Sequence, residues 1–64
     1  MNAENMIMNH VRKEFLKLGY SERDSNEVAA QALRKFRRNT PHKKAISEAI
    51  ADGKRLYKKV KNNG

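Results

Sequence analysis

Basic side chains surround a single Thr-Pro step in this sequence of 64 residues. An arginine guanidinium grips a phosphate through two parallel hydrogen bonds, and lysine adds a mobile point charge. The backbone N–H groups at the start of the helix expected after this step also favour an anion. The cluster consists of Arg34, Arg37, Arg38, His42, Lys43 and Lys44. These residue types at this spacing predict a contact site for phosphate groups.

A second set of cations follows along the C-terminal third of the chain. On a helical wheel of about 100° per residue, the cations from Lys43 to Lys61 fall opposite the apolar stripe that contains Ile46. The small residues Ser47 and Ala51 lie among them. Such a face can approach a phosphate backbone or enter a major groove. The candidate nucleic-acid-binding residues are Arg34, Arg37, Arg38, Lys43, Lys44, Ser47, Lys54, Arg55 and Lys58.

The positive charge is concentrated in the C-terminal half of the chain. Residues 1–31 carry four Lys or Arg against five Asp or Glu, whereas residues 32–64 carry eleven against two. The net charge of +8 therefore comes from one half, which predicts a basic surface for a polyanionic partner. We expect a DNA-binding regulatory or accessory factor whose affinity comes mainly from phosphate contacts.

The same positive charge would also suit RNA or an acidic protein as the partner. RNA modules that stack bases need exposed aromatic rings, and the aromatic residues here are expected in the core or at a helix cap. DNA is therefore favoured over RNA. The alternative function is a non-catalytic adaptor or inhibitor that docks its basic helical face on an acidic protein. The aromatic residues are Phe15, Tyr20, Phe36 and Tyr57.

The sequence lacks the patterns typical of catalysis, metal binding and membrane insertion. His10 and His42 stand alone with no cysteine to join them, so no metal site is expected. There is no Ser/His/Asp arrangement and no phosphate-loop fingerprint, so we expect neither an enzyme nor a cofactor. No run approaches the roughly 18 apolar residues of a membrane span, and residues 1–10 lack the layout of a signal peptide. We expect a cytoplasmic protein that does not bind membranes.

The first of three predicted helices covers residues 3–18. Its apolar residues recur at the spacings of one helix face. Gly19 follows as a left-handed cap, and Tyr20 is expected to pack back on Phe15 or Leu16. The apolar series is Ile7, Val11, Phe15 and Leu18.

The second helix is expected to start at Ser21, whose hydroxyl can accept a hydrogen bond from the N3 amide. Asp24 stands at N3 where glutamate is usual, so Ser25 is an alternative cap. Asn39 tolerates the left-handed conformation of a terminator, so the helix ends by that residue. The apolar face is Val28, Ala29, Ala32, Leu33 and Phe36.

Thr40 and Pro41 predict the start of the third helix. Threonine is a good N-cap, and proline suits the first helical position because its missing N–H has no partner there. We predict one helix over residues 41–61, since the apolar stripe keeps its register across Gly53. A glycine on the buried face indicates close approach by another helix. The alternative is a break at Asp52-Gly53 with a short fourth helix after it.

These elements predict an all-α chain, a small three-helix bundle with a helix-turn-helix-like corner between the second and third helices. Residues 1–64 form a single basic helical domain, and residues 62–64 are expected to fray. The standard DNA-binding motif is matched poorly, because aligning Asn39 with its turn glycine places Lys35 at its small-residue position and Arg38 at an apolar one. The expected core is Ile7, Val11, Phe15, Leu18, Val28, Ala32, Leu33, Phe36, Ile46, Ala49, Ile50, Leu56 and Tyr57.

A second copy of the chain is a further candidate partner. Met6 and Leu16 lie off the apolar stripe of the first helix. Together with Met1 and Met8 they would form an adaptable apolar patch, which would allow a homodimer through this helix.

Overall fold

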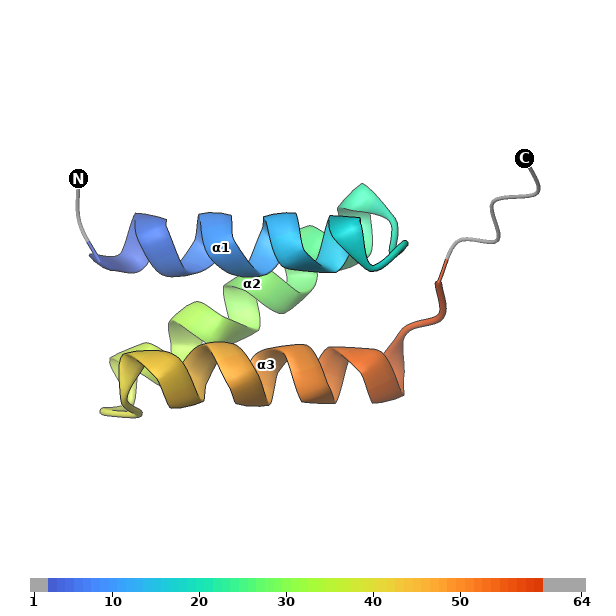
Figure 1. Cartoon of the computed structure of the whole chain (residues 1–64). Helices are drawn as coiled ribbons and strands as arrows, with labels where there is room; N and C mark the ends of the chain where they lie inside the picture. The colour runs from blue at the N-terminus through green and yellow to red at the C-terminus, as the bar shows by residue number, and fades with distance from the viewer. Residues whose placement is uncertain (1–2, 60–64) are drawn as a thin grey trace.

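The structure is a computed structural model that describes residues 3–59 of the chain. Its three helices are α1 (Ala3–Lys17), α2 (Glu22–Arg37) and α3 (His42–Leu56). Figure 1 shows α1 and α3 running in the same direction, with α2 crossing behind them and joining the end of one to the start of the other. The described range contains no strand, so the predicted all-α three-helix bundle is confirmed. None of these three helices is long and apolar enough to cross a membrane.

The turns between the helices follow the local signals of the sequence. The Ser21 Oγ accepts a hydrogen bond from the Asp24 N–H at 3.1 Å, which confirms the predicted cap of α2. Ser25, the alternative cap, is buried inside the helix, and its Oγ donates to the Ser21 carbonyl at 2.7 Å. Gly19 and Asn39 adopt left-handed φ angles of 101° and 69°, so both predicted terminators are confirmed. The predicted fraying of residues 62–64 lies outside the described residues.

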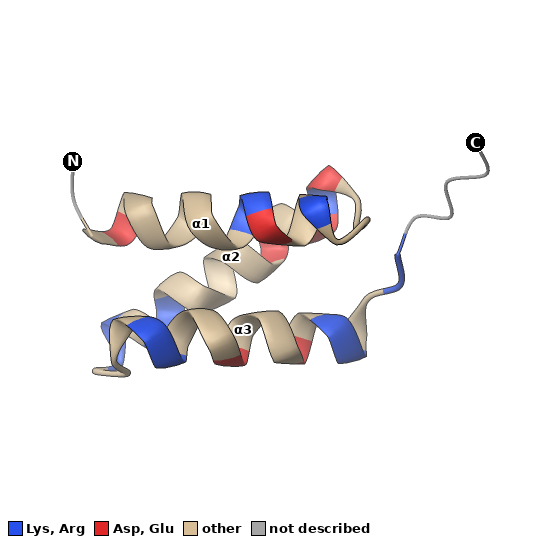
Figure 2. Ribbon diagram, viewed as in Figure 1, with Lys and Arg blue, Asp and Glu red and all other residues tan. Residues whose placement is uncertain are grey.

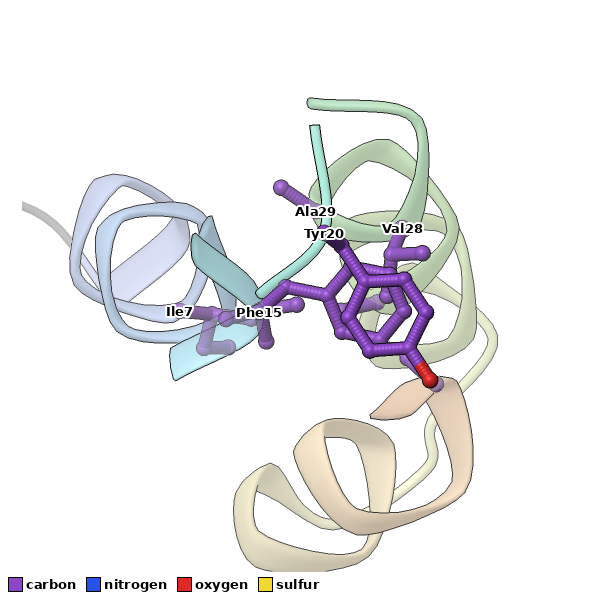
Figure 3. Close-up of a cluster of buried hydrophobic side chains, with 8 residues drawn as sticks. Ile7, Phe15, Tyr20, Val28 and Ala29 are labelled. Carbon is purple, nitrogen blue, oxygen red and sulfur yellow. The ribbon is translucent and has the colours of Figure 1, made fainter. Parts of the chain in front are cut away.

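Phe15 occupies the centre of the core. Its ring is fully buried and stacks on Tyr20, as Figure 3 shows. The two ring centroids are 3.9 Å apart, with 14° between the ring planes. The Tyr20 N–H also donates to the Phe15 carbonyl at 3.2 Å, so the turn after α1 folds back on its own helix. The predicted packing of Tyr20 on Phe15 is therefore confirmed.

The rest of the core consists mostly of small side chains. Five predicted members, Leu18, Phe36, Ile46, Ile50 and Tyr57, are only partly buried and pack against the edge of the core. Leu33 is also half-buried, and Leu56 is exposed. The buried apolar residues are Ile7, Val11, Phe15, Tyr20, Val28, Ala29, Ala32, Ala45 and Ala49.

Gly53 lies inside α3, which continues to Leu56 without the alternative break. The glycine is buried, and a Cβ built on it would lie 2.7 Å from the Phe15 Cζ and 2.7 Å from a Val28 methyl carbon. Real Cβ atoms do not approach so closely, so only glycine lets α3 reach this position. The predicted close helix contact at Gly53 is confirmed.

The end of α3 differs from the prediction. The helix stops at Leu56 rather than Lys61, and Tyr57 is extended, with φ −114° and ψ 154°. The Tyr57 ring meets Phe15 edge-on at 6.4 Å between centroids. The chain makes this core contact in place of the helical turn expected after Leu56. The placement of Leu56 in the core is wrong, since its side chain is 67% exposed. On the helical wheel Leu56 lies only about 60° from the buried Gly53, so its exposure follows from its place as the last residue of α3 and not from its angle around the axis.

Thr40 does not cap α3. The helix begins at His42, and Pro41 occupies the cap position with φ −55°, ψ 146° and no side-chain cap hydrogen bond. The predicted roles of Thr40 and Pro41 are therefore wrong by one residue. The extended ψ of Pro41 delays the helix, and the Thr40 N–H instead donates to the Lys35 carbonyl at 3.2 Å, closing the turn.

Replacement of Thr40 by alanine is expected to lower the free energy of unfolding by less than about 0.5 kcal/mol, because Thr40 makes no cap hydrogen bond. Urea unfolding followed by circular dichroism measures this change. Ser21→Ala is the matched control, since it removes a formed cap and should cost about 0.5–2 kcal/mol. A larger effect for Thr40→Ala than for Ser21→Ala would contradict the observed start of α3.

Gly53→Ala is expected to destabilise the fold. Alanine favours a helix over glycine by about 1 kcal/mol, but the added methyl group would overlap Phe15 and Val28. We expect the overlap to dominate, with a net destabilisation of roughly 1–2 kcal/mol on urea unfolding. The exposed Ala51→Gly on the same helix measures helix propensity alone. Stabilisation by Gly53→Ala would show that α3 does not press on the core there.

Candidate nucleic-acid interface

The corner between α2 and α3 brings two basic helix ends together. The Arg38 N–H donates to the Arg34 and Lys35 carbonyls, and Asn39 then turns the chain in a left-handed conformation. The rings of Phe36 and His42 meet edge-on at 6.5 Å between centroids, which packs the start of α3 against the end of α2. Figure 2 shows Lys and Arg on both helices at this end of the bundle.

The first turn of α3 is electrostatically unfavourable in isolation. It contains His42, Lys43 and Lys44 with no acidic residue, and no side chain caps its N–H groups. The N-terminus of a helix carries partial positive charge, so two lysines there repel it. An anion near this turn would relieve that repulsion.

Arg34 and Arg38 stand on one side of the corner. Both side chains are exposed, and with Gln31 and Lys35 they line a shallow depression of about 210 Å³ on α2. No carboxylate in residues 3–59 lies within ion-pairing distance of either guanidinium group. The two arginines are therefore available to an anionic ligand.

Lys35 has a structural role that the sequence did not reveal. Its Nζ lies 3.5 Å from both Glu48 Oε1 and Asp52 Oδ2, across the seam between α2 and α3. These two acids also reach Lys44 at 3.9 Å and Arg55 at 3.2 Å. The only two acids of residues 32–64 are thus directed toward α2, and they partly neutralise two of the predicted site residues.

Arg37 is engaged by the first helix. Its Nε and Nη2 donate to the two Glu4 carboxylate oxygens at 3.0 and 3.2 Å. These hydrogen bonds, with the charge of the guanidinium, lower the pKa of Glu4 below its ordinary 4.5. The same hydrogen bonds to Glu4 raise the pKa of Arg37. Arg37 therefore ties α2 to α1 and lies apart from the arginines of the corner depression.

The outward side of α3 carries the remaining predicted residues. Lys43, Ser47 and Lys54 are all exposed and share one face of the helix, together with Ala51. Lys43 and Lys54 are separated by roughly 16 Å along the helix axis. We call these four residues the outer face of α3. No ion pair joins either lysine to an acid of the described chain.

Lys58 lies beyond the end of α3. It is exposed in a non-helical segment, so the predicted continuation of the cationic helical face to Lys58 and Lys59 is wrong. The reason is the extended conformation of Tyr57, which takes the chain toward the turn after α1. The Lys59 Cδ lies 3.9 Å from a Cβ built on Gly19.

All four aromatic side chains lie in the part of the chain that the structure describes, and each is buried or half-buried. Phe15 and Tyr20 are buried, while Phe36 and Tyr57 are half-buried against the core. Residues 3–59 also contain no group of three or more His, Asp or Glu side chains that could hold a metal ion. The interface offers cations, one hydroxyl and small side chains.

The patch predicted on the first helix is smaller than expected. Met6 and Leu16 are 50% and 36% exposed, but Met8 packs against the core. Met1 lies outside the described residues. The homodimer through α1 stays a prediction.

The sequence and the structure were compared with known protein families, curated proteins and solved structures. No protein family, curated protein or solved structure matches this chain.

Glu4 is expected to titrate below its ordinary pKa of 4.5 in the folded protein. A lowered folded-state pKa means that the Glu4–Arg37 pair stabilises the fold above the unfolded pKa, and that this contribution disappears as pH falls through the folded pKa. NMR titration of the Glu4 carboxyl carbon measures the shift. Arg37→Gln should return the pKa toward 4.5, whereas Arg38→Gln, the control, should leave it low. An unchanged pKa in Arg37→Gln would contradict the pair.

Proposed function

We propose that this protein binds double-stranded nucleic acid, DNA in preference to RNA, through the outer face of α3. One observation carries the proposal. Lys43 and Lys54 are exposed and have no acidic partner among residues 3–59, while both acids of α3 are turned toward Lys35. This face therefore presents uncompensated positive charge, which suits the phosphate backbone.

The dimensions of α3 fit a major groove. The groove is about 12 Å wide and admits one α-helix. Lys43 and Lys54, roughly 16 Å apart along the axis, would contact phosphates on its two walls. Ser47 and Ala51 lie between them and are small enough for the helix to approach closely, and the Ser47 hydroxyl would face base edges.

Arg34 and Arg38 would add phosphate contacts beside the corner. They lie one helical turn apart on α2 and have no acidic partner in the described chain. In this arrangement the corner acts in a helix-turn-helix-like way, with α3 nearest the bases. Arg37, Lys44 and Arg55 would contribute less, since each shares its charge with a carboxylate. Binding of this kind corresponds to a regulatory or accessory role.

The test is the salt dependence of binding to a random-sequence DNA duplex. Removing one lysine that neutralises a phosphate lowers the slope of log K against log salt by roughly 0.9, so Lys43→Ala/Lys54→Ala should lower it by about 2. The control is Lys13→Ala/Lys17→Ala, which removes the same charge from exposed positions of α1.

Two results would contradict the proposal. One is an equal decrease of the slope in the control on α1, which would mean that overall charge alone drives binding. The other is a parent protein that binds the duplex no more tightly than a generic polycation of equal charge. Circular dichroism of each variant confirms that the helices are retained.

A further inference from the structure

A groove follows the seam between α2 and α3. The depression lined by Gln31, Arg34, Lys35 and Arg38 adjoins a second one of about 290 Å³, lined by Gln31, Asp52, Arg55 and Leu56. Gln31 belongs to both, and the Lys35–Asp52 ion pair at 3.5 Å joins one to the other. The two depressions therefore form one surface, which we call the α2–α3 groove.

The two ends of the groove differ in chemistry. At one end, Arg34 and Arg38 expose guanidinium groups with no acidic partner in residues 3–59. At the other end, Leu56 is 67% exposed, more than Met6 or Leu16, the other exposed large apolar side chains of the described chain. Arg55 lines the same end, with its guanidinium paired to Asp52 at 3.2 Å. A ligand that complements the groove needs negative charge at one end and an apolar side chain at the other.

We propose that the α2–α3 groove binds an acidic peptide segment of a protein partner. Its carboxylates would pair with Arg34 and Arg38, and an apolar side chain would cover Leu56. This site shares Arg34 and Arg38 with the proposed duplex interface but not the outer face of α3, and its occupant differs in class from the duplex. A bidentate arginine–carboxylate contact supplies both strength and orientation at the cationic end.

The middle of the groove favours a peptide over a phosphate chain. The Asp52 carboxylate pairs with Lys35 and Arg55 and can still accept a hydrogen bond from a peptide N–H, a donor that a phosphodiester backbone lacks. The Gln31 carboxamide both donates and accepts, as a peptide group does. A phosphate backbone would also leave Leu56 uncovered.

The test uses the full chain and a short fluorescent peptide in which glutamate alternates with leucine. Fluorescence anisotropy gives the affinity for the parent, for Leu56→Ser and for Arg34→Ala/Arg38→Ala. Each variant should bind the peptide at least about fivefold more weakly, as expected when an interface side chain that contributes strongly to binding is truncated. Peptides with glutamine for glutamate, or serine for leucine, should bind the parent correspondingly more weakly.

Two controls separate this proposal from the duplex proposal. Met6→Ser removes another exposed apolar side chain, on α1, and should leave peptide affinity unchanged. Lys54→Ala should also leave it unchanged, because Lys54 does not line the groove. A parent protein that fails to bind DNA yet binds the peptide would contradict only the duplex proposal.

Three outcomes would overturn the groove proposal. The serine peptide would bind as tightly as the leucine peptide, or Leu56→Ser would bind the leucine peptide as the parent does. Alternatively, Leu56→Ser would weaken duplex binding more than peptide binding, which would make the groove part of a nucleic-acid interface. Leu56 is exposed, so circular dichroism should show that its replacement leaves the helices intact.

Discussion

The close approach of α3 to Phe15 and Val28 at Gly53 is the constraint on which the rest of the structure depends. The chain has 64 residues and few large apolar side chains, so the burial of large side chains alone cannot stabilise its core. The absence of a side chain at Gly53 lets the α3 backbone lie against the Phe15 ring. That ring also stacks on Tyr20 and meets Tyr57 edge-on, so one aromatic side chain of α1 contacts both the turn after α1 and the segment after α3.

This packing also decides where the charges of α3 point. With Gly53 buried against α1 and α2, the helical repeat directs Glu48 and Asp52 toward α2, where Lys35 bridges them at 3.5 Å. Lys43 and Lys54 then face solvent on the opposite side. Core packing therefore decides that the two acids of α3 meet α2 while Lys43 and Lys54 face solvent, and both proposed ligands depend on this arrangement.

Most of the fold could be predicted because its determinants are local. Ser21 bonds to an amide three residues away, and Gly19 and Asn39 end helices through their own φ angles. The continuity of α3 through Gly53 followed from the register of the apolar stripe. The errors occur where longer-range packing competes with local signals. Tyr57 leaves the helix to reach Phe15, and Thr40 bonds to the end of α2 instead of capping α3.

The sequence by itself determined that the chain is a helical bundle with an excess of positive charge at the α2–α3 corner. Only the tertiary structure decided which of those cations are available to a ligand. Arg37 is bound by Glu4, 33 positions away, and Lys35 is bound by Glu48, 13 positions away. The physical reason is the sequence separation over which each kind of interaction acts. Helix caps and apolar periodicity act between residues a few positions apart, whereas ion pairs, burial and the exposure of Leu56 depend on which neighbours the other helices supply.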